Sequence, residues 1–123
     1  MISLSIISAE DKRKEVEALQ IAREMERIAH EALRGQRVEQ LVEHLFNVAK
    51  SNIERSTFNG CEVLITETLL IRWGHPHWDE LMDALNITIT LLNQAGYCTN
   101  PWREYSDSWR KRSGKVGYFY VKW

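Results

Sequence analysis

The sequence predicts an α+β protein: two long N-terminal helices, then a strand, a third helix and a β-hairpin that form a small, mainly antiparallel sheet. Apolar residues recur every three or four positions over most of residues 9–95, which is typical of amphipathic helices. Short runs of β-branched and aromatic residues in the second half predict strands, and glycines separate the two patterns. Because 123 residues are a one-domain length, we expect a single domain, 1–123, made of a helical hairpin (9–58) and a strand–helix–hairpin part (60–123).

The first helix is expected to begin near Ala9. Ser8 resembles an N-cap residue, two acidic residues in the first turn suit the helix dipole, and residues 2–7 before it alternate like a short strand. A stripe of small residues then recurs in four-three-four-three steps, with larger apolar residues beside it and charges on the opposite face. Small residues allow two helices to approach closely, so the stripe is a candidate face for homo-oligomerisation. It consists of Ala18, Ala22, Met25, Ala29 and Ala32.

A second apolar helical pattern runs from Val38 to about Phe58, and only the tripeptide 34–36 interrupts the two patterns. Gly35, at its centre, suits either a tight turn between antiparallel helices or a position inside one bent helix. Glycine costs only about 1 kcal/mol in a helix interior and does not by itself force a break. We nevertheless favour the turn, which gives the helical hairpin.

The second half of the chain predicts the sheet. The β-branched residues 61–66 form the first strand. A loop then leads to the third helix, 78–95, which Gly96 ends, because the position after a helix often needs a left-handed backbone that glycine adopts without strain. Two aromatic-rich strands follow, beginning at Tyr97 and Val116. A winged-helix module has a similar order, but the two N-terminal helices are too long for it.

The charge of the chain is unevenly distributed. Its net charge is −1, but residues 1–100 hold 10 Lys/Arg against 15 Asp/Glu, whereas residues 101–123 hold 6 against 2. The basic part either forms an interaction surface or docks on the acidic helices of its own chain, and we prefer the second interpretation. Two cysteines, Cys61 and Cys98, are too few for a disulfide framework. With no leader and no long apolar run, the sequence indicates a cytoplasmic protein without a membrane partner.

No stretch carries a recognisable catalytic or cofactor motif. His75, His77 and Asp79 offer two imidazoles and a carboxylate, but a proline separates the histidines and no second ligand cluster exists. We therefore expect no bound metal, and we interpret this loop as packed around Trp73 and Trp78. Since no nucleophile, base and orienting group can be identified together, the sequence predicts no cofactor and no enzymatic activity.

The segment 102–115 interleaves arginines with aromatic rings. Such residues suit a protein interface, a site for nucleotides or single-stranded nucleic acid, or a hairpin whose rings cover the core while its arginines stay solvated. Glu104 and Asp107 count against nucleic acid, because carboxylates oppose phosphates. With the tryptophans of the 73–78 loop added, the candidate binding residues are Trp102, Arg103, Tyr105, Trp109, Arg110, Arg112, Trp73 and Trp78.

Three marks in the second half form a further pattern. A helix ends at Gly60 before a strand, an amphipathic helix ends in Gly96 followed by tyrosine, and the last strand ends in Trp123. In these marks, over roughly residues 40–123, the chain resembles a type of small, mostly uncharacterised protein encoded by tailed bacteriophages. The resemblance implies a phage origin more than any activity. The insertion 101–115 and the Trp/His-rich loop 73–78 depart from that pattern, and either is a candidate to carry the chain's own function.

We interpret the chain as a non-enzymatic phage accessory protein that binds and inhibits a host or anti-phage-defence macromolecule in the cytoplasm of an infected bacterium. We expect the partner to be a protein. Two alternatives stay open. Arg103, Arg110 and Arg112 suit a protein that sequesters a nucleotide signal, whereas the alanine stripe suits a minor virion or assembly component that forms a homo-oligomer.

Overall fold

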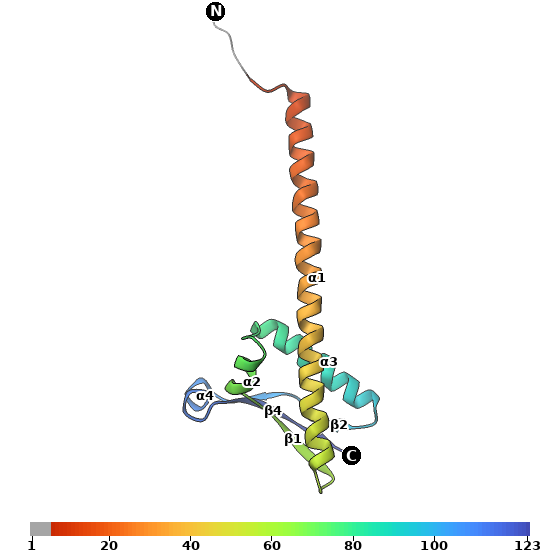
Figure 1. Ribbon diagram of the computed structural model, residues 1–123, viewed down its shortest axis with the longest axis vertical. Helices are drawn as coiled ribbons and strands as arrows, with labels where there is room; N and C mark the ends of the chain where they lie inside the picture. Colours follow the sequence, from red (N-terminus) through yellow and green to blue (C-terminus); the bar gives the residue numbers. More distant parts are fainter. Residues whose placement is uncertain (1–5) are drawn as a thin grey trace, which may run out of the picture. The chain divides into compact units, whose positions relative to one another are not determined.

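A computed structural model of the chain describes residues 6–123. The chain divides into two compact units, Met1–Gly35 and Gln36–Trp123. The predicted α+β fold is confirmed: helices precede a small antiparallel sheet. In chain order the elements are α1 (Ala9–Arg55), β1 (Gly60–Thr66), α2 (Glu67–Arg72), α3 (Trp78–Gln94), β2 (Cys98–Thr99), β3 (Arg103–Glu104), α4 (Asp107–Ser113) and β4 (Lys115–Lys122) (Figure 1).

α1 is one uninterrupted helix of 47 residues that passes through Gly35. The predicted turn at Gly35 is therefore wrong, and so are the helical hairpin (9–58) and the division into two long helices. Gly35 lacks the positive φ of a left-handed turn residue. Its neighbours Arg34, Gln36 and Arg37 all favour helix, so that a cost of about 1 kcal/mol at one glycine does not interrupt the hydrogen-bonded ladder.

The start of α1 agrees with the sequence. Ser8 Oγ accepts a hydrogen bond from the Asp11 N–H at 3.2 Å, which is the expected N-cap contact. Most of the strand predicted for residues 2–7 falls outside the described residues. Ile6 and Ile7, which are described, do not belong to a strand.

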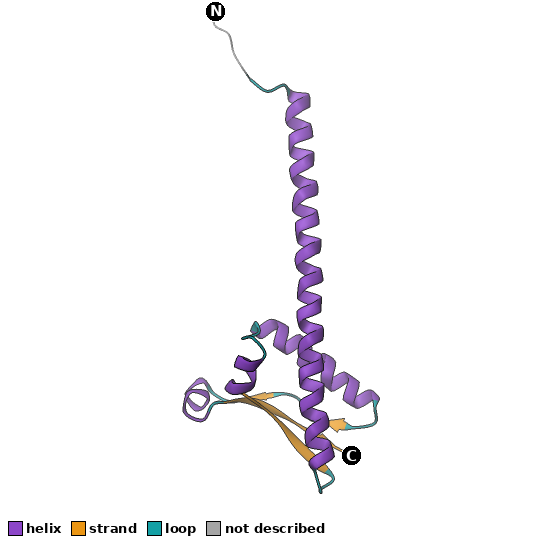
Figure 2. Cartoon of the chain, viewed as in Figure 1, coloured by secondary structure: helices purple, strands orange, loops and turns teal. Residues whose placement is uncertain are grey.

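β4 is the central strand of a four-stranded antiparallel sheet (Figure 2). One edge of β4 pairs with β1, with Gly60 opposite Lys122 and Val63 opposite Phe119. The other edge pairs with two short strands: β2 lies beside the C-terminal end of β4, and β3 lies beside Tyr118. The first arm of the predicted hairpin is thus divided into β2 and β3.

Caps and glycines set the limits of the short helices. α3 coincides with the predicted third helix, and Gly96 follows it with a φ of 100°. α4 is an addition to the prediction. It begins where Ser106 Oγ accepts a hydrogen bond from the Trp109 N–H at 3.3 Å, and it ends at Gly114, whose φ is 70°. The segment 102–115 therefore contains a short strand and a helix.

The core of the Gln36–Trp123 unit lies between helices and one face of the sheet. Phe119 and Val121 of β4 alternate with residues of the opposite face and pack with Leu45 of α1 and Leu85 of α3. All four side chains are almost inaccessible to solvent. This core fixes β4, and β4 in turn positions the segment that carries α4.

Candidate binding surface around α4

Arg110 connects three helices. Its Nε donates a hydrogen bond to Glu67 Oε1 of α2, and its Cζ lies 5.7 Å from the centroid of the Trp78 ring at the start of α3. The hydrogen bond to Glu67 is the main reason why the pKa of Arg110 is raised above its usual value. The contact fits the interpretation that the basic part docks on acidic helices of its own chain, and it holds Arg110 in one position.

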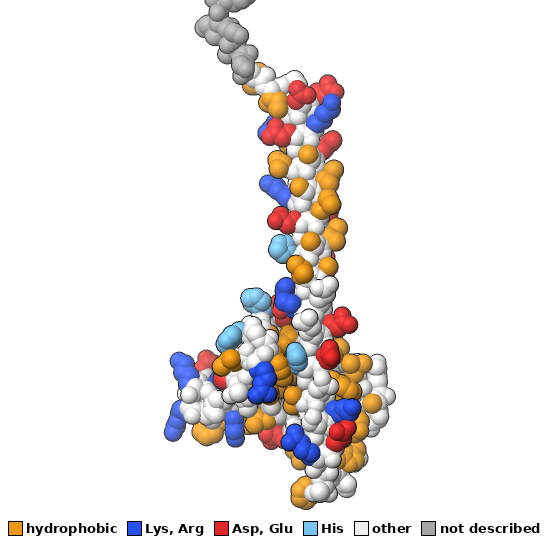
Figure 3. All heavy atoms as spheres, viewed as in Figure 1, with side chains coloured by type: hydrophobic (Ala, Val, Ile, Leu, Met, Phe, Trp, Pro, Cys, Tyr) orange, Lys and Arg blue, Asp and Glu red, His pale blue; other side chains and the backbone are white. Residues whose placement is uncertain are grey.

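Two indole rings stay accessible in this region: one in contact with Arg110 and one on the residue that precedes it in the chain. Trp78, which lies under the guanidinium, is 39% exposed, and Trp109, the preceding residue of α4, is 44% exposed. Large exposed aromatic side chains on a folded unit are typical of sites that contact another molecule. Lys and Arg side chains gather at the same end of the unit, to the left in Figure 3.

Cations outnumber acids along this segment. Lys111 and Arg112 stand in the last turn of α4, where positive charge complements the helix dipole, and both are exposed. Arg103 of β3 is exposed as well. A pocket of about 480 Å³ beside α4 is lined by both basic and acidic side chains, and the acidic ones are Asp107 and Glu67. We use the term α4 surface for Trp78, Arg103, Trp109, Arg110, Lys111 and Arg112.

Trp102 and Tyr105 are placed differently from the other predicted binding residues. The Trp102 ring packs over Gly117 of β4, where the absence of a side chain makes room for it. Its indole nitrogen is buried and has no hydrogen-bond partner among the described residues. The ring of Tyr105 is half-buried, 5.6 Å from that of Tyr118. These two rings cover the sheet, whereas Trp109, Arg103 and Arg112 face solvent.

The 73–78 loop lines a second pocket, of about 400 Å³. Trp73 stacks on His44 of α1, with ring centroids 5.5 Å apart and planes 8° from parallel. Gly74 and His75 both have a positive φ, of 82° and 51°, and they turn the chain sharply before α3. Trp73 therefore belongs to this pocket, whereas Trp78 contacts Arg110 of α4.

An ion pair forms part of the wall of this second pocket. Arg37 Nη2 donates to Glu80 Oε1 at 2.7 Å, and Arg37 Nε lies 3.1 and 3.2 Å from the two carboxylate oxygens. Glu80 is only 4% exposed, so its charge depends on partners within the protein. Sequence reasoning missed this pair, because the two residues are 43 positions apart and each fits its own helix: Arg37 as a surface residue, Glu80 as a first-turn acid.

Within the described part of the chain, no group of three or more His, Cys, Asp or Glu side chains is arranged to hold a metal ion. His75 and His77 line the second pocket, and Asp79 stands in the first turn of α3. Cys61 and Cys98 are free thiols on strands that flank β4 from opposite sides. Burial raises the pKa of Cys61, which opposes formation of a reactive thiolate.

No helix in residues 6–123 has both the length and the apolar character needed to cross a bilayer.

The α4 surface is the principal candidate site on the Gln36–Trp123 unit, and the pocket lined by Trp73 is the second. Comparisons of the chain with protein-family models, with curated proteins and with solved structures find no match.

Proposed function

We propose that this protein is a non-enzymatic phage accessory protein that binds and inhibits a host or defence-system protein through the α4 surface. One observation carries the proposal: the accessible Trp78 ring lies against Arg110, which its own chain already holds in place, and the preceding residue of α4, Trp109, is accessible as well. Tryptophan and arginine are the residues that most often dominate the binding energy of protein interfaces.

Preorganisation supports this use of the surface. A long side chain that is ordered only upon binding loses conformational entropy, which reduces affinity. Two contacts restrict the Arg110 side chain before any partner arrives, the hydrogen bond to Glu67 and the contact with the Trp78 ring. A partner that contacts Arg110 therefore loses less of its binding free energy to the ordering of this side chain.

Charge defines the chemistry of the partner. Arg103, Lys111 and Arg112 are exposed, and around them an acidic protein surface would form favourable pairs and associate faster. Glu67 and Asp107 lie in the adjacent pocket and oppose a chain of phosphates. The nucleotide-signal alternative has less support for the same reason, because the carboxylate of Glu67, which pairs with Arg110, would repel a phosphate placed beside that arginine.

The replacement Trp109→Ala/Arg112→Ala should weaken partner binding at least tenfold, which corresponds to about 1.4 kcal/mol. The immobilised chain is used to capture partners from nuclease-treated bacterial lysate, and the dissociation constant of each captured protein is then measured by calorimetry. Trp123→Ala/Lys50→Ala is the matched control, because it also removes one exposed tryptophan and one exposed cation. Equal retention of the same proteins by both variants would show that the α4 surface is not the contact site.

A further inference from the structure

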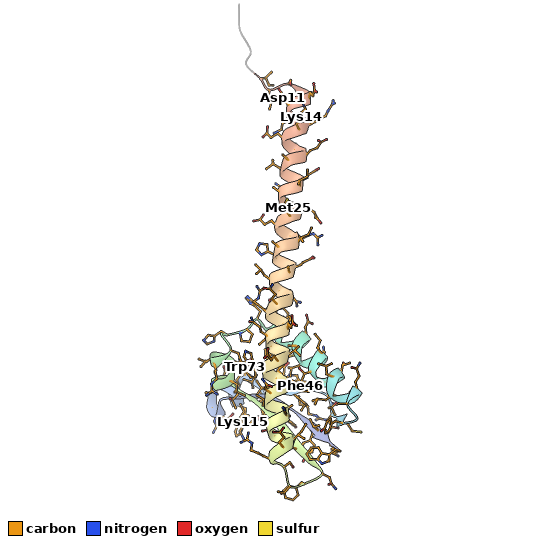
Figure 4. All side chains as sticks on the ribbon, turned by 45° about the vertical axis from the view of Figure 1, so that its right-hand side comes forward. Asp11, Lys14, Met25, Phe46, Trp73 and Lys115 are labelled. Carbon is orange, nitrogen blue, oxygen red and sulfur yellow. The ribbon has the colours of Figure 1, made fainter. Side chains whose placement is uncertain are left out.

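The part of α1 in the Met1–Gly35 unit has an unusual exposure pattern. Every described side chain from Ile6 to Leu33 is exposed. Large apolar side chains are among them: Ile21 is 62% exposed, Met25 66% and Ile28 54%. Figure 4 shows Met25 on this stretch of helix. Most helical stability in proteins comes from packing of an apolar face, whereas the described apolar side chains of this stretch are exposed.

The exposed apolar residues follow a coiled-coil repeat. Ile21, Met25 and Ile28 are separated by four and three residues, and Ala18 and Ala32 extend the same spacing in both directions. In heptad notation these five are consecutive a and d positions. Ala22 and Ala29 then fall at e positions, directly beside this seam. The alanines let a second helix approach closely, while the larger residues supply the buried apolar surface.

Along the seam from Ala18 to Ala32, the charges are arranged so that a parallel copy meets no like charge at the flanking g and e positions. The g positions beside the seam from Ala18 to Ala32 are Glu17, Glu24 and Glu31. In a parallel pair each g residue lies near an e residue of the other helix, which is Ala22 or Ala29 for the first two. An antiparallel pair would instead bring g positions of both helices together, glutamate against glutamate.

Several charges of this helix are paired within one chain. Arg27 binds Glu24 and Glu31 with contacts of 2.5 Å each, one turn away on either side. Glutamates are as frequent on this face as cations, unlike the Lys- and Arg-rich polar face of helices that lie on membranes. What the segment lacks is therefore an apolar partner and not a counter-charge.

We infer that residues 18–32 of α1 form a parallel coiled coil with the same segment of a second copy of this chain. The seam runs from Ala18 to Ala32, with Met25 at its centre. The wider alanine stripe, which includes Ala22 and Ala29, lies on the side where the two backbones come closest. Because five core positions make a short seam, the association is concentration-dependent.

Sedimentation equilibrium of the full chain tests whether a second copy of the chain covers the apolar face of this helix. The wild type should sediment as an oligomer at high concentration and dissociate on dilution, whereas Ile21→Glu/Ile28→Glu should be monomeric throughout. Gln20→Glu/His30→Glu places two carboxylates on the opposite face of the same stretch and should assemble like the wild type. A wild type that is monomeric at every concentration overturns the proposal. This holds even if the chain binds lipid vesicles or a different protein, because the proposed partner is a second copy of the chain. Equal assembly of both variants would show that Ile21 and Ile28 do not lie in the contact between the two helices.

Oxidative cross-linking tests the orientation. In a Cys61→Ala/Cys98→Ser background, Ala18→Cys and Ala32→Cys should each form a disulfide-linked dimer, because equivalent residues face each other in a parallel pair. Glu26→Cys, outside the seam, is the control and should cross-link at least tenfold more slowly. Rapid linkage between mixed Ala18→Cys and Ala32→Cys chains, with none between identical chains, would indicate an antiparallel pair and overturn the parallel arrangement.

Discussion

Gly117→Ala should destabilise the Gln36–Trp123 unit by about 3 kcal/mol, at the upper end of the range for overpacking. A Cβ at this position would overlap the Trp102 ring and lie 2.6 Å from the backbone oxygen of Arg103, and the latter cannot move without breaking the pairing of β3 with β4. The free energy of unfolding, measured by denaturant titration with tryptophan fluorescence, gives the result.

Gly35→Ala is the matched control for this substitution. Nothing lies within 4 Å of the position that its Cβ would occupy, and Gly35 is inside α1. Alanine should therefore stabilise the helix by about 0.5–1 kcal/mol. Equal effects of the two substitutions would mean that Trp102 does not pack over Gly117, while a loss of helix in Gly35→Ala would restore the turn.

Arg37→Met should lower the free energy of unfolding by about 2 kcal/mol. Glu80 is buried, and removal of Arg37 takes away the charge-assisted hydrogen bonds that Arg37 donates to it. The figure is below the usual cost of breaking a buried pair, because the Arg37 side chain is half exposed and part of its charge is already screened by water. Chemical denaturation at constant pH measures the loss.

A double-mutant cycle isolates the Arg37–Glu80 interaction. With Glu80→Gln in the background, Arg37→Met should cost clearly less than in the wild type, because the carboxylate charge is then absent. Arg23→Met removes an exposed arginine from the same helix and should change stability by no more than about 0.5 kcal/mol. Additive effects of the two pocket substitutions would show that the pair is not coupled.

Local patterns predicted the elements whose signals are local. The periodicity and the glycine at 96 gave α3 nearly to the residue, and the β-branched run gave β1. Gly35 was misinterpreted because a glycine that follows one helical pattern and precedes another has the same local signature in a turn and in a helix. α4 was missed because seven residues show too little periodicity, although Ser106 and Gly114 are its cap signals.

The candidate site depends on contacts that no local pattern contains. The sequence identified the segment 102–115 as rich in arginine and aromatic residues, but it did not separate Trp102, which covers the sheet, from Trp109, which is exposed. That difference arises from the pairing of β3 with β4, which places Trp102 over a glycine. The Arg110–Glu67 pair likewise joins residues 43 positions apart.

We propose above that the apolar seam of α1 from Ala18 to Ala32 packs against the same segment of a second copy of the chain. Amide hydrogen exchange of the full chain, followed by mass spectrometry at high and low protein concentration, tests it most directly. Peptides from residues 18–32 should be protected at high concentration and exchange much faster after dilution, while peptides from residues 38–55 stay equally protected in both. Exchange in residues 18–32 that is the same at both concentrations would contradict the claim.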